Sequence, residues 1–182
     1  MELPTGLSTD SLDSDVLLTN CIDDVKDLLI INPTVKIYGR ESIQHRSIGF
    51  FSNDSIGYRY SGQLAKSQPL TQNLTEILQM INTKFGTHFN GILVNKYENG
   101  LDYIGAHSDV GVDDVVSVSF GAVRTFRIRN KTTKKMVVDI PTISGGIIYM
   151  SDDFQKAHTH EIPKQTKVKE VRFSLTFRYH SS

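Results

Sequence analysis

The residues His107-Ser108-Asp109 have the types and the spacing of a metal-binding pair. Residues i and i+2 of a strand point to the same side, so an imidazole and a carboxylate at a strand end can reach one metal ion. The stretch NGLDYIGA before them leads out of the apolar run GILVNKY, which places the pair at such an end. Triplets of this kind also arise by chance, and the alternative is a histidine and an aspartate that only solvate a turn.

A third ligand must come from a distant histidine, because it has to approach the metal from another strand. The segment AHTHEIP offers His158 and His160, which share a face if the segment is extended, so their spacing does not choose between them. Two histidines and one carboxylate form the facial triad of non-haem Fe(II) enzymes, which leaves open positions for a bidentate oxoacid and O₂. A four-ligand site would be closed to this chemistry.

The run VRFSLTFRY alternates strictly between apolar and polar residues, which predicts a strand. Its polar side carries Arg172 and Arg178, about 20 Å apart at ~3.3 Å per residue. Two inward-leaning guanidiniums would leave a gap of about 8 Å, near the length of a five-carbon diacid, so the pair could bracket 2-oxoglutarate. The commoner meaning of such alternation is a strand with a solvated polar face, and the strand alone favours that meaning.

Asn95 and Tyr97 lie on one face of GILVNKY, opposite Ile92 and Val94. Their amide and phenol groups could donate hydrogen bonds to the same diacid. The alternative is a strand end that simply carries polar residues.

Two amphipathic helices precede a region of short strands. Apolar residues at helical spacing in CIDDVKDLLII and LTQNLTEILQMINTKF predict helices over residues 21–31 and 70–85. After Gly86 come the short β-branched or aromatic runs GILVNKY, VVSVSFG, RTFRIR, MVVDI, GGIIYMS and VRFSLTFRY. Two helices backing many strands predict an α+β, mainly β fold, a jelly roll or double-stranded β-helix. Segment 35–62 adds VKIYG, SIGFF and GYRYSG, which we expect outside the barrel or over its mouth.

The length of 182 residues suits one domain. Residues 1–15 are small, polar and acidic and predict a flexible lead-in, so the domain would cover residues 16–182, with a catalytic core over about 86–179. Lys+Arg and Asp+Glu number 20 each, so any nucleic-acid contact must be local. The single cysteine, Cys21, excludes an internal disulfide. Without a signal-like or membrane-spanning stretch, we expect a soluble intracellular monomer, in cytoplasm or nucleus, with no membrane contact.

Taken in order, the stretches YRYSG, NKYENGLDYIGAHSD, SVSFGAVRTFRIR, HEIP and RFSLTFR resemble the AlkB family. The resemblance covers about residues 35–179 and is strongest to the nuclear DNA-repair members. It implies an Fe(II)- and 2-oxoglutarate-dependent dioxygenase that uses O₂ to demethylate N-alkylated bases, such as 1-methyladenine and 3-methylcytosine, in DNA or RNA, releasing aldehyde, succinate and CO₂. AlkB-type domains also occur within some viral replicases, which leaves open that the chain is a domain of a larger polypeptide.

The resemblance also implies a role for each candidate residue. His107, Asp109 and His160 would bind iron, because the family's distal histidine precedes a hydrophobic-Pro step, as His160 does in HEIP. Arg172 would pair with the far carboxylate of 2-oxoglutarate, and Arg178 would lie near the metal end. The residues implied for the cosubstrate are Asn95, Tyr97, Arg172, Ser174 and Arg178.

Residues of about 35–62 would form a nucleotide-recognition lid. The resemblance implies that Tyr60 stacks on a flipped base, with Tyr58, Arg59 and Ser61 beside it. The alternative for Tyr60 is a strand aromatic that covers the core.

The sequence departs from the DNA-repair members at two positions. An acidic residue that contacts the exocyclic amine of the base is replaced by Gly111, and the next acids are Asp113 and Asp114. The family's asparagine in the last strand is Ser174, which keeps a hydroxyl donor. The first change puts the base preference in doubt.

A basic run could track a phosphate backbone, although such runs are more often a solvated hairpin face. Its members are Arg124, Arg127, Arg129, Lys131, Lys134 and Lys135, with Phe126 interleaved. Two other functions compete with base demethylation. One is the same oxidation on a protein or lipid substrate, and the other is a catalytically silent nucleic-acid-binding module, against which an intact triad and both arginines argue.

Overall fold

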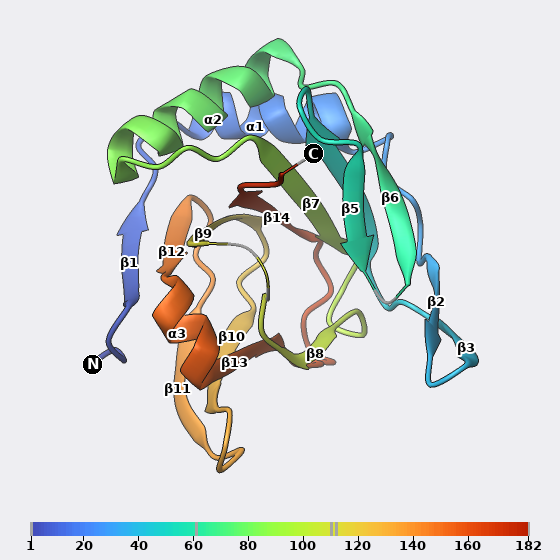
Figure 1. Ribbon diagram of the computed structural model, residues 1–182, viewed down its shortest axis with the longest axis vertical. Helices are drawn as coiled ribbons and strands as arrows, with labels where there is room; N and C mark the ends of the chain where they lie inside the picture. The colour runs from blue at the N-terminus through green and yellow to red at the C-terminus, as the bar shows by residue number, and fades with distance from the viewer. Residues whose placement is uncertain (1, 61, 110, 112, 182) are drawn as a thin grey trace.

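The computed structural model describes residues 2–60, 62–109, 111 and 113–181. Two sheets face each other (Figure 1). Residues of both sheets line a pocket between them. The larger sheet consists, in spatial order, of β1 (Leu7–Ser11), β12 (Gly146–Met150), β9 (Val115–Gly121), β14 (Arg172–Arg178), β7 (Gly91–Tyr97), β4 (Ser47–Ser52), β6 (Gln63–Gln68) and β5 (Gly57–Tyr60). The smaller sheet consists of β11 (Met136–Pro141), β10 (Thr125–Asn130), β13 (His158–Ile162) and β8 (Ile104–His107). The predicted jelly roll is confirmed.

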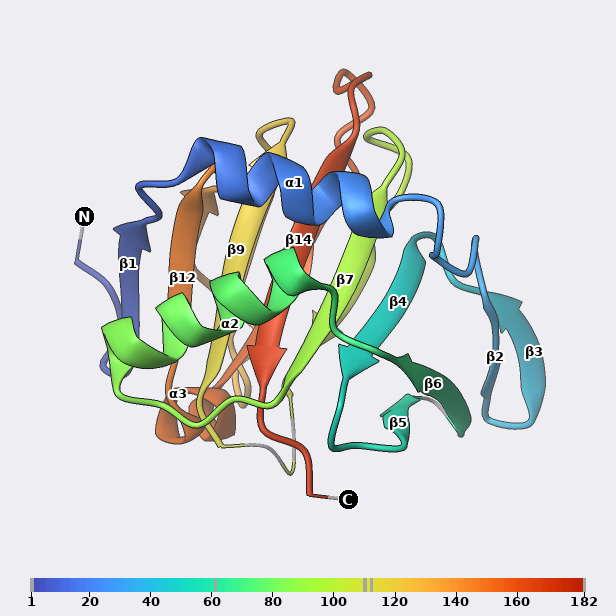
Figure 2. The same cartoon turned by 90° about the horizontal axis from the view of Figure 1, so that it is seen from above.

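Helices α1 (Asp15–Val25) and α2 (Gln72–Phe85) cover the outer face of the larger sheet (Figure 2). The prediction of α2 is confirmed, and its buried side is Leu74, Ile77, Leu78 and Ile81. The predicted helix over 21–31 is instead shifted toward the N-terminus. It ends at Val25, and the chain then turns so that Ile30 forms an isolated β-bridge with Ile48 of the larger sheet. No helix in the described part of the chain is long and apolar enough to cross a membrane.

The expectation of a flexible lead-in over residues 1–15 is wrong for residues 7–11. These residues form β1, which pairs antiparallel with β12 at the edge of the larger sheet. Four of the five residues are exposed, and only Leu7 is buried, against a cluster that includes Phe154. An edge strand with one buried residue lacks the apolar alternation by which strands are recognised.

The expectation for segment 35–62 is wrong in its middle part. Strand β4 is buried along its whole length and pairs antiparallel with β7, so it belongs to the larger sheet. Its residues Ile48 and Phe50 pack on one face and Phe51 packs toward the helices on the other. The rest of the segment forms the separate hairpin of β2 (Thr34–Ile37) and β3 (Arg40–Ile43), and the β5–β6 pair at the sheet edge.

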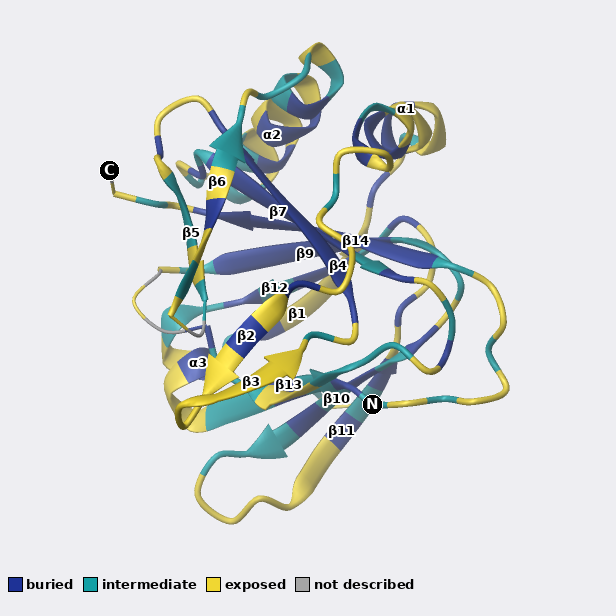
Figure 3. Cartoon of the chain, turned by 90° about the vertical axis from the view of Figure 1, so that its right-hand side faces the viewer, coloured by how far each residue is buried: buried dark blue, intermediate teal, exposed yellow. Residues whose placement is uncertain are grey.

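Strand β14 lies at the centre of the larger sheet, between β7 and β9. All seven of its residues are buried (Figure 3). Its apolar residues Phe173, Leu175 and Phe177 pack in the cluster shared with the helices. Its polar residues line the space between the sheets, so the solvated-face alternative for this strand is wrong.

The place of β1 in the fold can be tested at Leu7. Replacing Leu7 by Ala removes a buried side chain that is 6% exposed and should lower the free energy of unfolding by about 2 kcal/mol or more. Leu101→Ala is the control, because that side chain is 58% exposed and its loss should change stability by less than about 0.5 kcal/mol. Urea unfolding of both variants measures the difference. Equal stability of the two would mean that residues 7–11 do not pack on the sheet.

Candidate active site

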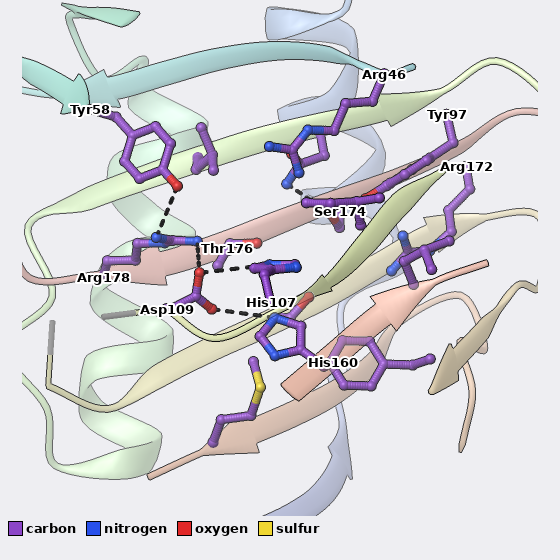
Figure 4. A pocket seen from close by; sticks show the side chains of 17 residues that line it. Arg46, Tyr58, Tyr97, His107, Asp109, His160, Arg172, Ser174, Thr176 and Arg178 are labelled. Carbon is purple, nitrogen blue, oxygen red and sulfur yellow. Dashed lines mark hydrogen bonds and ion pairs between the residues drawn. The ribbon is translucent and has the colours of Figure 1, made fainter. Parts of the chain in front are cut away.

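His107, Asp109 and His160 meet between the two sheets (Figure 4). One ligand atom from each lies within 4.8 Å of the others. His107 ends β8 and stands directly opposite His160 of β13 in the antiparallel register, and their ring centroids are 4.3 Å apart. Asp109 follows two residues after His107, beyond the end of the strand. A histidine pair and a carboxylate on one side of a cavity have the composition of a facial triad.

Asp109 is held inside the protein by an ion pair with Arg178 and by a contact with His160. Its Oδ1 accepts a hydrogen bond of 2.8 Å from Nη2 of Arg178, and its Oδ2 lies 3.4 Å from Nε2 of His160. Burial alone would raise the pKa of this carboxyl, but Arg178 and the two histidines outweigh it and hold the pKa well below its usual range. Asp109 is therefore an anion, which is the form that binds a metal ion.

His107 is held as a neutral ring. Burial, and then the neighbouring His160, lower the pKa of His107 to about 3, despite the opposing effect of Asp109. Its Nδ1 lies 2.8 Å from the carbonyl oxygen of Gly105, which can only accept, so Nδ1 donates. This leaves the lone pair on Nε2, the atom on the side of Asp109, for a metal.

The structure brings His160, and not His158, to the other two residues. The ring of His160 is buried and stacks on Phe126 at 5.1 Å between centroids. The ring of His158 stacks instead on Phe154, at 4.7 Å. The two histidines are only two residues apart, but they have different surroundings. His158 is the C-cap of α3 (Asp152–Ala157), so its backbone is held at the end of that helix.

A small polar pocket adjoins the triad and is floored by β14 and β7. Arg172 is 2% exposed, and its Nη2 donates to Oγ of Ser119 at 2.9 Å. Its guanidinium lies 5.3 Å from the ring of Tyr97, and Asn95 Nδ2 donates to Ser174 Oγ at 3.2 Å. Burial lowers the pKa of Arg172 to about 10, with Tyr97 opposing.

Several buried atoms of this pocket have no hydrogen-bond partner. They are Nε and Nη1 of Arg172, Nε of Arg178, Nε of Arg46, Nδ1 of His160 and Oδ1 of Asn95. Buried polar groups are normally paired, so unpaired guanidinium donors indicate an anion that fits against them. A diacid reaching from Arg172 to the triad fits the guanidinium donors of this set.

A larger cleft of about 1000 Å³ opens on the other side of the triad. Tyr58, Arg59 and Tyr60 of β5 line it, together with His107 and Asp109. The rings of Tyr58 and Tyr60 are stacked, with centroids 5.8 Å apart and planes 11° apart. Tyr58 also contacts Arg178, whose guanidinium lies 4.9 Å from its ring. Ser61, the other predicted lid residue, lies outside the described residues.

Comparison with known proteins assigns the family. The model of the 2OG-Fe(II) oxygenase superfamily matches residues 32–178. The chain belongs to the 2OG-Fe(II) oxygenase superfamily. Enzymes of this superfamily use Fe(II), 2-oxoglutarate and O₂, and the triad and the unpaired donors of the pocket suit the first two.

The relatives within this superfamily are of AlkB type. Human DNA oxidative demethylase ALKBH2 is 29% identical over 156 residues, which cover 79% of this chain and 60% of the relative. Human alkB homolog 3, an alpha-ketoglutarate-dependent dioxygenase, is 33% identical over 137 residues, which cover 68% of this chain and 48% of the relative. The chain thus spans about half to three fifths of these proteins. The solved structure of OsALKBH1 superposes with a TM-score of 0.63 at 15% identity, covering 98% of this chain and all of that one, which shows the shared fold.

Two residues of the site were not predicted from the sequence. Gln155 of α3 is buried, and it holds Asp109 on both sides: its Oε1 accepts from the Asp109 amide and its Nε2 donates to Oδ2, both at 3.2 Å. Arg46 is 7% exposed and lines both the pocket and the cleft. Neither belongs to a sequence pattern, because each reaches the site only through the packing of separate elements.

The basic run of residues 124–135 is not a free cationic face. Arg124 is buried and donates to the carbonyl oxygens of Asn99, Asp102 and Pro163. Arg127 pairs with Asp139, and Arg129 pairs with Glu161. Phe126 is buried against His160 and does not interleave the run at a surface. The arginines thus stabilise the smaller sheet, and the hypothesis that the whole run tracks phosphates is wrong.

Gln155 should control how well the triad takes a metal. Gln155→Leu removes both contacts to Asp109, and loss of a group that orients a metal ligand typically weakens metal binding by about tenfold to a hundredfold. Calorimetric titration with Mn²⁺ measures the affinity, and melting of the metal-free protein shows that the variant is folded. Lys156→Ala on the same helix is the control, because that side chain is 67% exposed. Equal Mn²⁺ affinity in both variants would show that Gln155 does not position Asp109.

Proposed function

We propose that the protein oxidatively demethylates N-alkylated bases, such as 1-methyladenine and 3-methylcytosine, in DNA or RNA. The observation that carries the proposal is the position of the triad at the boundary of two cavities. One is a small pocket with unpaired guanidinium donors, and the other is an open cleft with stacked tyrosines. A dioxygenase needs an oxoacid on one side of its metal and the bond to be oxidised on the other. The relative ALKBH2 is a DNA oxidative demethylase, which supports a base as the substrate.

In this proposal His107, Asp109 and His160 hold Fe(II). When bound with 2-oxoglutarate and O₂, the metal supplies an oxidant that hydroxylates an adjacent C–H bond. One oxygen atom enters succinate as CO₂ is lost, and the other leaves in the aldehyde once the hydroxylated N-alkyl group breaks from the base nitrogen. The contribution of the chain is to fix the positions of the reactants and to supply charge.

Arg172 would bind the far carboxylate of 2-oxoglutarate, with Asn95, Tyr97 and Ser174 donating further hydrogen bonds. Its unpartnered donors Nε and Nη1 support this role, since a carboxylate could accept a charge-assisted hydrogen bond from either of them. Arg178 would serve the metal end, where it already neutralises Asp109. The pocket would thereby set the direction in which the cosubstrate lies.

The lid residues would receive the base. Tyr60, whose ring stacks on that of Tyr58, would offer a flat surface to one face of a flipped base in the cleft that His107 also lines. Arg59 is exposed beside them and could contact the backbone phosphate. Ser61 lies outside the described residues, and its contact with the base stays a prediction.

The decisive experiment is incubation with Fe(II), 2-oxoglutarate and alkylated oligonucleotides, both DNA and RNA, with loss of the methyl group measured by mass. His160→Ala should abolish turnover, because only two of three metal ligands remain. His158→Ala is the matched control and should retain most activity, since its ring packs on Phe154. Retention of turnover in His160→Ala, or loss of it only in His158→Ala, would refute the ligand assignment.

Tyr60 separates base recognition from general oxygenase chemistry. Stacking on a base is worth roughly 1–3 kcal/mol by alanine substitution, so Tyr60→Ala should lower oligonucleotide turnover by about tenfold to a hundredfold. Conversion of 2-oxoglutarate to succinate without substrate should stay near wild type, and Tyr60→Phe should be mild because the ring does the stacking. Loss of both activities with a lowered melting temperature would make Tyr60 a core residue, and loss of neither would place it away from the substrate.

A further inference from the structure

The cleft is poor in negative charge. Among its described lining residues the only carboxylate is Asp109, and this group is already paired with Arg178 and His160. The sequence places no acidic residue between Asp109 and Asp113. A base that enters this cleft therefore meets no free carboxylate.

The two acids that follow do not replace the missing one. Asp114 accepts hydrogen bonds from the hydroxyl of Tyr149 and, at 3.0 Å, from the amide of Asp152. These contacts turn it toward β12 and the start of α3. Asp113 is exposed and is not among the residues that line the cleft.

Positive charge in the cleft, in contrast, is uncompensated. Arg46 is 7% exposed, its Nε is buried without a partner, and no described residue forms an ion pair with its guanidinium. Figure 4 shows this guanidinium reaching into the pocket from the start of β4. Arg59 adds a second cation at the cleft. The charges of a divalent metal and a dianionic cosubstrate would cancel. The positive charge of Arg46 and Arg59 would therefore remain in excess when both are bound.

Charge of this sign discriminates between kinds of alkylated base. 1-Methyladenine and 3-methylcytosine are cations at neutral pH and present an amine beside the methylated nitrogen, so they need an acceptor. 3-Methyluracil and 3-methylthymine are neutral, and a carbonyl oxygen flanks the methylated nitrogen on each side. A guanidinium only donates, so it can bind these carbonyls and it repels the cations.

We infer that the cleft prefers neutral N-alkylated bases with carbonyl edges, of the 3-methyluracil type, over the cationic 1-methyladenine and 3-methylcytosine. This inference rests on the proposed function. It selects, within the N-alkylated bases, the neutral ones as the preferred substrates. Arg46 is the donor that selects the carbonyl edge, and Gly111 is the position at which an acceptor for the amine is missing.

Gly111 offers a way to reverse the preference. It lines the cleft, and a Cβ built on it would have no neighbour within 4 Å. Its φ of +76° is one that Asp and Asn tolerate better than other side chains. Gly111→Asp would place a carboxylate in the cleft, and Gly111→Asn has the same shape and the same backbone strain without the charge.

The test compares 3-methyluracil with 3-methylcytosine at one position of a single-stranded oligonucleotide, as DNA and as RNA. The two rings differ only in the carbonyl or amine at C4 and in charge. Wild type should have a kcat/KM for 3-methyluracil at least about fivefold higher. Gly111→Asp should shift this ratio toward 3-methylcytosine by about tenfold relative to Gly111→Asn, and Arg46→Gln should lower turnover of 3-methyluracil more than that of 3-methylcytosine.

The outcomes separate this inference from the proposed function. Preference of the wild type for 3-methylcytosine, or an equal ratio in Gly111→Asp and Gly111→Asn, overturns the inference and leaves base demethylation in place. If the protein converts 2-oxoglutarate to succinate but demethylates none of 3-methyluracil, 3-methylcytosine and 1-methyladenine, both this inference and the proposed function are overturned. Melting of each variant confirms that it is folded, and the Asp and Asn variants remain comparable even if both are less stable than wild type.

Discussion

The packing of the two sheets depends on how the protein stabilises two arginines that are buried between them, Arg172 and Arg178. Strand β14 is buried on both faces, yet it carries two guanidiniums, which cannot release their protons. Removing a charge from water without a partner is costly. Arg178 is neutralised by Asp109, whereas Arg172 contacts, among the described residues, the hydroxyl of Ser119 and the ring of Tyr97 and no carboxylate. The sheet is thus incomplete without an anion, and the dianionic cosubstrate of the superfamily would supply the missing charge.

The elements with a strong period could be predicted from the sequence. Helix α2 buries Leu74, Ile77, Leu78 and Ile81, and strand β14 buries Phe173, Leu175 and Phe177, as their periods predicted. Strand β7 places Asn95 and Tyr97 on the pocket side, as expected. The meaning of the polar face of β14 could not be predicted from that strand, because a solvated and a pocket-lining face have the same alternation. The family resemblance indicated the correct face, and the covering smaller sheet explains it.

The remaining parts of the site follow from tertiary contacts that leave little trace in the sequence. Strands β8 and β13 and helix α3 are four to six residues long, too short for a period to be recognised. The position of Gln155 beside Asp109 and the choice of His160 over His158 depend on how these short elements pair. Arg127 and Arg129 of β10 show that a sequence pattern can also suggest a site that the fold does not form. They belong to a basic run in the sequence, but in the structure they pair with Asp139 of β11 and Glu161 of β13.

The order of the strands along the chain has a consequence for how the protein acquires its site. β14 is the last strand in sequence, but it forms the centre of the larger sheet, where it joins β7 to β9. Until β14 pairs with both neighbours, it does not connect β7 to β9. The edges of β7 and β9 that face β14 then lack hydrogen-bond partners. These pairings join residues far apart in the chain, which is slow in folding. The central pairings of the larger sheet, and the pocket to which Arg172 and Arg178 belong, can therefore form only after β14 has been synthesised.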